Sequence, residues 1–208
     1  IKYGSDKCLE FTDRLMSTFR DEAYKTSIYM SRDKGPFEEF DASKYLKEEY
    51  AKTLPARIRM LIREHGIRNA VMLTIAPTGT ISMVHGVSSG VEPIFAAMYK
   101  RRYREKNNWQ ETVVVDPLFK EHFDKGLDLE DFVGAYDVTP KQHMAVQAVC
   151  QRYIDSSISK TINLPESATA EDLNNTALAF APYLKGMTIY RAGSKGNEPL
   201  EAIPLNEE

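Results

Sequence analysis

Apolar side chains recur at helical spacing along the N-terminal part of the chain. The repeating positions are Leu9, Leu15, Met16, Phe19, Ala23, Ser27 and Met30. Residues three or four apart share one face of a helix, so this stripe predicts a long amphipathic helix over residues 5–33. Ser5-Asp6 supplies a helix start, and Gly35-Pro36 ends the pattern because neither residue favours a helix interior.

Proline and glycine divide the middle of the chain into shorter elements. A short helix is expected near Asp41, and another over residues 55–65, where Pro55 suits a first helical position and Gly66 a C-terminal stop. The further expectations are a buried strand over 70–75, an extended segment over 94–103, a strand over 111–115, a helix over 116–125 and a loop over 126–138.

The C-terminal part of the chain alternates helix and strand patterns. Helices are expected over 139–155 and 170–185, a strand over 157–163 and a buried strand over 188–191. Pro182 is expected to kink or shorten the second helix. Such alternation predicts an α/β fold with mostly parallel strands joined by helical crossovers. We divide the chain into one domain over 1–196 and a flexible tail over 197–208.

Composition is that of an ordinary globular protein. Of the 208 residues, 42% are hydrophobic and 27% are charged, which allows a sizeable core. The formal net charge of −3 argues against a large surface that tracks nucleic acid. The basic cluster at 100–106 is the exception, and we interpret it as a solvated or inter-subunit face in preference to a binding patch.

Targeting and redox signals are few. No apolar run approaches the ~20 residues that a membrane span needs, and no signal peptide is visible. Cys8 and Cys150 lie in helical patterns without CxxC spacing, so we expect neither a disulfide framework nor a metal site. These patterns predict a cytoplasmic protein that contacts neither membrane nor nucleic acid.

The most informative segment is the turn that follows the strand expected at 70–75. Ala76-Pro77 breaks the strand, Thr78-Gly79-Thr80 turns the chain, and residues 81–84 begin a short helix. The first amides of a helix lack intrahelical partners and point the same way, which favours an anion such as phosphate. The candidate phosphate-binding residues are Pro77, Thr78, Gly79, Thr80, Ile81 and Ser82. The alternative is a strand–turn–helix connection that binds nothing.

Several motifs stand in a fixed order around this turn. PTGTIS at 77–82 precedes GVSSGVEP at 86–93 and Arg101-Arg102, and SISKTINLP at 157–165 precedes KGMTIYR at 185–191. Upstream stand Glu22-Ala23-Tyr24-Lys25, Gly35-Pro36-Phe37 and Ile67-Arg68-Asn69. Together these motifs resemble the large, catalytic subunit of ribonucleotide reductase, in the manner of its adenosylcobalamin-dependent class. The resemblance covers roughly residues 5–196, which is far more specific than a lone PTGT.

The resemblance implies both a fold and a function. Ribonucleotide reductases make deoxyribonucleotides for DNA synthesis, and the turn at 77–82 corresponds to their substrate-phosphate loop. The family fold is a ten-stranded α/β barrel of two five-stranded halves, and this chain would supply the second half. Because a half barrel exposes strand edges, we expect a complementary chain or self-association. The implied cofactor is adenosylcobalamin, and the implied substrate is a ribonucleoside di- or triphosphate.

Ribonucleotide reduction needs a thiyl radical, and the family carries its cysteine in the pattern Asn-x-Cys-x-Glu. That pattern is absent from this sequence, because Cys8 has Asp6 where the asparagine should stand. Cys150 reads as a small core residue, and the family's redox-active C-terminal cysteine pair is also missing. We therefore expect no catalytic residue in this chain. The radical cysteine would come from another chain of a split enzyme, or from a segment that an excised piece lacks.

Other polar residues of the motifs receive narrower expectations. Tyr190 follows Ile189 where diiron-dependent reductases carry two adjacent tyrosines that relay a radical, and a broken pair fits a radical made locally on adenosylcobalamin. Tyr190 is a candidate for the active-site wall, with a packed strand aromatic as the equal alternative. Glu92 is expected to fix its loop through an ion pair or a cap. No role is assigned to Lys160 or Asn163.

Two rival functions stand beside the reductase hypothesis. One is a non-catalytic assembly or regulatory module that kept the fold, whose partner binding would ignore substitutions at 77–82. The other is a phosphate-binding enzyme of different chemistry, which is disfavoured because the sequence offers no visible nucleophile–base pair.

Overall fold

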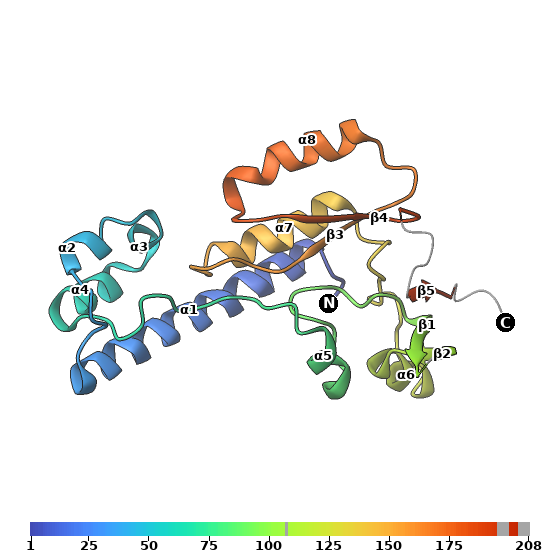
Figure 1. The fold of residues 1–208 in the computed structure, drawn as a ribbon, viewed down its shortest axis with the longest axis horizontal. Helices are drawn as coiled ribbons and strands as arrows, with labels where there is room; N and C mark the ends of the chain where they lie inside the picture. Colours follow the sequence, from blue (N-terminus) through green and yellow to red (C-terminus); the bar gives the residue numbers. More distant parts are fainter. Residues whose placement is uncertain (107, 195–199, 204–208) are drawn as a thin grey trace.

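The computed structural model describes residues 1–106, 108–194 and 200–203. Figure 1 shows a long helix with a group of short helices at one end and small sheets toward the other. The helices are α1 (Asp6–Lys34), α2 (Ala42–Tyr45), α3 (Glu49–Thr53), α4 (Ala56–His65), α5 (Gly79–His85), α6 (Pro117–Asp124), α7 (Pro140–Gln151) and α8 (Ala170–Phe180), with the 3-10 turn η1 (Ala181–Tyr183). The strands are β1 (Met98–Glu105), β2 (Asn108–Val115), β3 (Thr161–Leu164), β4 (Thr188–Arg191) and β5 (Leu200–Ala202).

Helix α1 confirms the long amphipathic helix expected over 5–33. It begins where the Ser5 hydroxyl accepts a hydrogen bond from the Cys8 amide, and it ends at Gly35, whose φ of 78° suits glycine. Its buried face packs against α4, which Gly66 ends as expected. The core between these helices comprises Tyr24, Ile28, Ala51, Leu54, Ile58, Ile62 and Ile67.

Helix α7 supports the parallel strand pair β3–β4. A capping box between Thr139 and Gln142 starts the helix, which then lies against α1 and β3. Met144 of α7 and Leu173 of α8 pack against the same buried residues of β3, which are Ile162 and Leu164. Since successive strand residues point to opposite faces, residues 161 and 163 are left on the other side of the pair.

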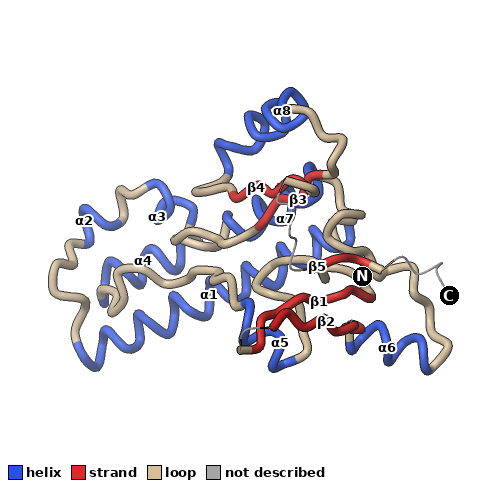
Figure 2. Tube along the Cα trace, turned by 45° about the vertical axis from the view of Figure 1, so that its right-hand side comes forward, coloured by secondary structure: helices blue, strands red, loops and turns tan. Residues whose placement is uncertain are grey.

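The second sheet is antiparallel, with strand order β2–β1–β5 (Figure 2). Its β1–β2 hairpin carries the basic cluster, and Arg102 of β1 pairs with Glu111 of β2 at 3.0 Å and with Glu201 of β5 at 3.4 Å. Residues 200–202 were expected to belong to a tail, but they form β5 and pair with residues 99–101. The rest of the expected tail, 197–199 and 204–208, lies outside the described residues.

The α/β class is confirmed, but the expectation of mostly parallel strands is not met by the described strands. Parallel pairing is limited to β3–β4 and to an isolated bridge between Ile75 and Ile158. The strands β1 and β2 follow each other through a short turn at Lys106, and a connection without a crossover helix forces antiparallel pairing.

Several boundaries also differ from the sequence expectations. The segment 70–75 is not a strand apart from the bridge at Ile75, and β3 is limited to Thr161–Leu164. Strand β4 was expected to be buried, but three of its four residues are exposed, with Ile189 at 37%. Helix α7 ends at Gln151, and α3 was not foreseen. Helix α8 ends before Pro182, as the proline predicts.

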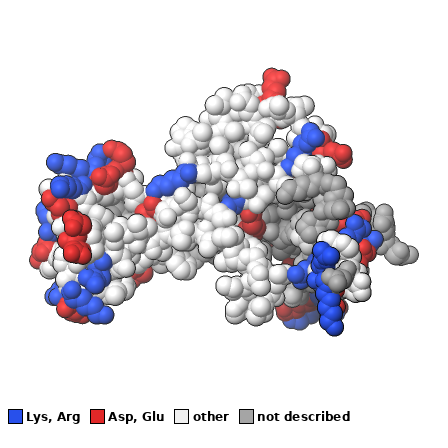
Figure 3. All heavy atoms as spheres, viewed as in Figure 1, with Lys and Arg blue, Asp and Glu red and all other residues white. Residues whose placement is uncertain are grey.

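Charged side chains gather at the two ends of the face shown in Figure 3. They cover the region of α2–α4 and that of the β1–β2 hairpin, whereas uncharged residues dominate the middle. Within the described ranges, no helix combines the length and the apolar character that crossing a membrane requires.

Candidate functional site

The turn at 77–82 joins the Ile75 bridge to helix α5. The Ser159 amide donates to the Ile75 carbonyl at 2.8 Å, which holds the incoming segment beside the chain that leads into β3. Thr78 then adopts φ 45° and ψ 25°, a left-handed conformation that is costly for a β-branched residue. The Thr78 Oγ1 accepts a hydrogen bond of 2.8 Å from the Gly90 amide, so a contact with a distant loop stabilises this conformation.

The first amides of α5 face outward from the turn. Helix bonding begins with the Ser82 amide, which donates to the Thr78 carbonyl at 2.9 Å. The preceding amides of Gly79, Thr80 and Ile81 have no acceptor among the described residues, and all three residues are exposed. An added Cβ at Gly79 would meet nothing within 4 Å, so there is open space for a ligand at this position.

Two of the candidate hydroxyls are occupied within the protein. The Ser82 Oγ is 2.9 Å from the Ser89 Oγ and donates to the Gly79 carbonyl at 3.1 Å, and Ser82 is only 5% exposed. Gly90 has φ 50°, and a Cβ there would lie 2.9 Å from the Ala76 carbonyl oxygen. Only glycine therefore fits between the two loops. The loop at 86–93 therefore contacts the turn through Thr78 and Ser82. The amides of Gly79, Thr80 and Ile81 take no part in these contacts.

A cavity of about 920 Å³ adjoins the turn. Pro77, Gly79 and Ser82 line it, whereas Thr78, Thr80 and Ile81 are not part of its lining. The cavity thus brings three of the six candidate residues together with Glu92, Asn163 and Tyr190, which lie far away in the sequence. The other lining residues include Ser88, Ser89, Phe95, Tyr99, Arg101, Val114, Tyr136, Ser159 and Thr161. The role of Arg101 in this wall was missed because the sequence showed it only as one member of a basic cluster.

Glu92 lies in the cavity wall and forms the expected ion pair. Its Oε2 accepts a hydrogen bond of 2.6 Å from Lys160 Nζ, and its Oε1 accepts one of 2.5 Å from the Thr161 amide. Lys160 is 1% exposed, and its ammonium also lies 2.9 Å from His143 Nδ1. Burial lowers the pKa of Lys160, while the neighbouring Glu92 carboxylate opposes this shift.

His143 is the neutral member of this buried group. Burial and the nearby Lys160 lower the pKa of His143 from 6.5 to about 4. The neutral ring accepts from Lys160 at Nδ1, so its Nε2 carries the proton and donates to the Ala135 carbonyl at 2.9 Å. The sequence assigned no role to Lys160 and offered no reason to single out His143, because only the tertiary structure brings the two side chains together.

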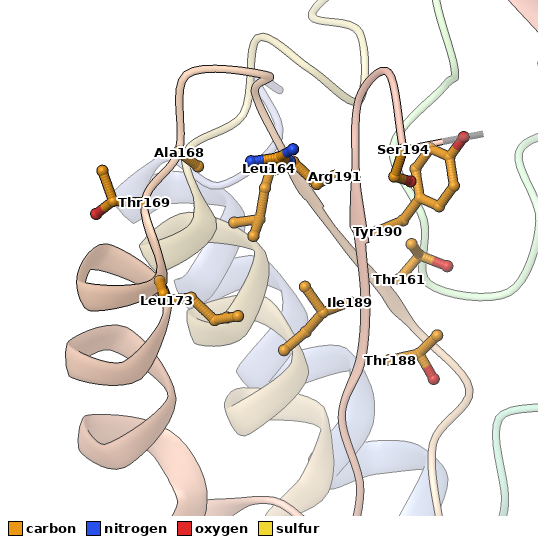
Figure 4. A pocket seen from close by; sticks show the side chains of 11 residues that line it. Thr161, Leu164, Ala168, Thr169, Leu173, Thr188, Ile189, Tyr190, Arg191 and Ser194 are labelled. Carbon is orange, nitrogen blue, oxygen red and sulfur yellow. The ribbon is translucent and has the colours of Figure 1, made fainter. Parts of the chain in front are cut away.

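A second cavity of about 830 Å³ lies between α8 and the strand pair (Figure 4). Ile189 of β4 points toward Leu173 of α8, and Tyr190 points to the opposite side of the strand, as alternation along a strand requires. Tyr190 lines both cavities and lies opposite Asn163 in the parallel register. Tyr190 is partly buried, and it shares the lining of the first cavity with Gly79 and Ser82.

Neither cysteine lies at these cavities. Cys150 is 1% exposed, and burial raises the pKa of its thiol to about 12. Cys8 is half-buried on α1 and is absent from the lining of both cavities. Across residues 1–106, 108–194 and 200–203, no cluster of three His, Cys, Asp or Glu side chains is placed to hold a metal ion. The arrangement suits anion binding, and it offers no reactive thiol.

These features define an α/β domain in which the turn at 77–82 shares a cavity with a parallel strand pair. The family model for the ribonucleotide reductase barrel domain matches residues 1–190. The chain therefore belongs to the ribonucleotide reductase barrel-domain family.

Similar proteins carry reductase names of two kinds. The chain is 35% identical to a vitamin B12-dependent ribonucleoside-diphosphate reductase of Thermoplasma acidophilum, over 97% of this chain and 27% of that protein. It is 26% identical to a protein of the same name from Mycobacterium tuberculosis, over 97% of this chain and 30% of that protein. It is 28% identical to the ribonucleoside-diphosphate reductase subunit alpha of Helicobacter pylori, over 93% of this chain and 26% of that protein. The chain thus spans less than a third of the length of each of these relatives.

Proposed function

We propose that this chain is a component of a cobalamin-dependent ribonucleotide reductase, and that its turn at 77–82 binds the phosphates of the ribonucleotide substrate. The observation that carries the proposal is the outward set of unpaired amides at Gly79, Thr80 and Ile81, beside a cavity large enough for a nucleotide. The names of the relatives supply the substrate class, a ribonucleoside diphosphate, and vitamin B12 as the cofactor.

The physical basis is the charge at the start of a helix. Unpaired amides at a helix N-terminus carry partial positive charge, and phosphate oxygens satisfy them without an opposing side chain. Gly79 has no Cβ that would keep a phosphate away from the backbone. The hydroxyls of Thr78 and Ser82 hold the turn in shape through Gly90 and Ser89, so binding falls to the backbone and to the exposed Thr80.

The cavity wall would receive the rest of the nucleotide. Tyr190, Asn163 and Glu92 line the same cavity as the turn, and they come from β4, β3 and the loop after α5. We assign Tyr190 to the active-site wall on this basis. Its hydroxyl and ring would orient the substrate, and the isolated position after Ile189 gives no second tyrosine for a radical relay.

The radical chemistry would come from elsewhere in the enzyme. When bound, adenosylcobalamin would supply radical chemistry, and a thiol near the ribose would be needed to use it. The lining of the cavity contains no cysteine among the described residues, so its residues fit substrate binding and do not fit the radical step. We therefore propose that the radical cysteine belongs to another chain or another segment of the enzyme.

Exposed apolar side chains support such a complement. On and beside α5, Ile81 is 63% exposed, Val84 is 80% exposed and Val87 is 63% exposed. Large exposed apolar patches mark surfaces that another part of a protein covers. We propose that this chain forms one half of a ten-stranded α/β barrel, with strands of the complement completing the sheet beyond β4.

The phosphate role can be tested with Gly79→Val in the complete reductase that contains this chain. The added side chain meets no neighbour within 4 Å at its Cβ, so it should obstruct a phosphate without disturbing the fold. We expect CDP to bind about tenfold more weakly or worse, with cytidine binding unchanged, in calorimetric titrations. The matched control is Gly186→Val, which is also unobstructed and lies outside both cavities. Unchanged CDP affinity in Gly79→Val would reject the phosphate role.

Reconstitution tests the role of the complement. The mixture contains this chain, a second chain with the motif Asn-x-Cys-x-Glu, adenosylcobalamin and a thiol reductant. We expect this mixture to reduce ribonucleotides. Thr80→Val should weaken that activity. Failure with a verified complement would count against a split enzyme. The assembly-module alternative predicts another outcome. The complement would then bind this chain without producing activity, and substitutions at 77–82 would not change that binding.

A further inference from the structure

Lys160 is a fully buried cation that touches neither cavity. Its side chain is 0% exposed, and it stands just before β3 in a group formed by Glu92, His143, Thr161 and Tyr3. The three ammonium protons match three acceptors, namely Glu92 Oε2 at 2.6 Å, His143 Nδ1 at 2.9 Å and the Thr161 carbonyl at 3.1 Å. Every donor of this buried charge is therefore committed to the protein.

Glu92 links this buried group to the loop at 86–93. Its carboxylate is held by Lys160 Nζ and by the Thr161 amide, and its own amide donates to the Ser89 carbonyl at 2.8 Å. Tyr3 adds a second anchor, because its hydroxyl donates to the Val91 carbonyl at 2.6 Å. The C-terminal part of the loop is thus fixed to the start of β3 and to the N-terminal segment.

The same loop holds the turn at its other end. Ser89 Oγ lies 2.9 Å from Ser82 Oγ, and the Gly90 amide donates to Thr78 Oγ1 at 2.8 Å. A continuous series of contacts therefore leads from Lys160 through Glu92 and Ser89 to the two residues that shape the turn. The left-handed φ of 45° at Thr78 needs such support, because an unsupported threonine avoids this conformation.

We propose that Lys160 is a positioning residue for substrate binding: through Glu92 it fixes the loop at 86–93, and that loop sets the geometry of the turn at 77–82. This inference rests on the proposed phosphate role of the turn. Lys160 itself does not touch the substrate.

The competing explanation is that the ion pair only stabilises the fold. Buried ion pairs are often no more stabilising than apolar side chains of similar volume, whereas removal of one partner leaves a costly unpaired charge. The double variant Lys160→Met with Glu92→Leu separates the two explanations. It removes both charges together, so no buried charge is left unpaired. The fold should lose only the hydrogen bonds that these side chains make to Thr161 and His143, while the loop is released.

The experiment compares this double variant with the unmodified protein in the complete reductase. We expect the double variant to stay folded with a somewhat lower urea-unfolding midpoint, and we expect the ratio of CDP affinity to cytidine affinity to fall about tenfold. The ratio is the readout because Glu92 also lines the cavity, so Glu92→Leu can change cytidine binding by itself. In steady-state assays KM for the nucleotide should rise, because positioning of the phosphate affects binding. Unchanged CDP affinity in a folded double variant would overturn the proposal.

A second variant and a ligand-free measurement also test the positioning role of Lys160. If the double variant does not fold, Ser89→Ala removes the side-chain contact between the loop and Ser82, and CDP affinity equal to that of the unmodified protein would overturn the proposal. Hydrogen exchange of the amides at 78–90 reports the loop geometry without any ligand. If Gly79→Val leaves CDP binding intact while the double variant accelerates this exchange, the phosphate role fails and the positioning of the loop stands.

Discussion

The carboxylate of Asp155 holds the backbone of Leu73, which lies far away in the sequence. Its Oδ1 accepts a hydrogen bond of 2.7 Å from the Leu73 amide, and its Oδ2 accepts one of 2.7 Å from the Met72 amide. The Tyr24 hydroxyl adds a third contact to Oδ2 at 3.2 Å. A side chain therefore takes the place of the neighbouring strand that the apolar run at 70–75 led us to expect.

Asp155→Ala should destabilise the fold. The substitution leaves two backbone amides without their charge-assisted partner, and bonds of this kind contribute about 1.5–3 kcal/mol each. We expect the free energy of unfolding to fall by roughly 2–4 kcal/mol in urea titrations. The exposed pair of Lys120 and Asp124 supplies the control, because Asp124→Ala should leave the midpoint nearly unchanged. Equal midpoints for the two variants would contradict the structural role of Asp155.

His143 should make stability depend on pH. The folded state holds the pKa of His143 at about 4, while the unfolded state takes up a proton near pH 6.5. Between these values the unfolded state binds more protons, so stability falls as pH is lowered from 6.5 toward 4 and then levels off. The size of this effect is roughly 3 kcal/mol.

The measurement is a series of urea-unfolding curves from neutral pH down to about pH 4. His143→Gln should flatten the slope in this window relative to the unmodified protein. His85 is exposed, so His85→Gln should keep the original slope. A slope that survives in His143→Gln would show that another group causes the dependence.

Two substitutions at Thr78 separate strain from hydrogen bonding. Thr78→Val keeps the strained φ of 45° and loses the acceptor for the Gly90 amide, so we expect about 1 kcal/mol of destabilisation. Thr78→Gly loses the same acceptor but relieves a backbone strain of about 1 kcal/mol or more, so its stability should stay near that of the unmodified protein. Thermal unfolding measures the stability of both variants. If Thr78→Gly is less stable than Thr78→Val, the backbone at Thr78 is not strained.

The two cysteines should differ in reactivity. The Cys150 thiol is buried with a pKa of about 12, so it should resist alkylation by iodoacetamide in the folded protein and react after unfolding. Cys8 is half-buried and should react first. Mass spectrometry of modified peptides measures this order, with Cys8→Ser as the control that should leave the native protein almost unmodified. Rapid native labelling of Cys150 would contradict its assignment to the core.

The sequence by itself determined most of the helices and the position of the turn at 77–82. The stripe along α1, the capping residues of α7 and the stop at Gly66 act through neighbours in the chain, so they can be read without the fold. The same holds for the turn at 77–82, where proline and glycine break the apolar run. Local order of this kind is set by backbone geometry and by side-chain spacing.

Only the tertiary structure decided which residues meet. The buried Lys160, the bracing of Thr78 by Gly90 and the joint wall of Glu92, Asn163 and Tyr190 all join segments that are distant in sequence. Strand pairing was misjudged at 70–75 for the same reason, since a strand needs a partner and Asp155 supplied the hydrogen bonds instead. Contacts between distant segments depend on packing, which no local pattern encodes.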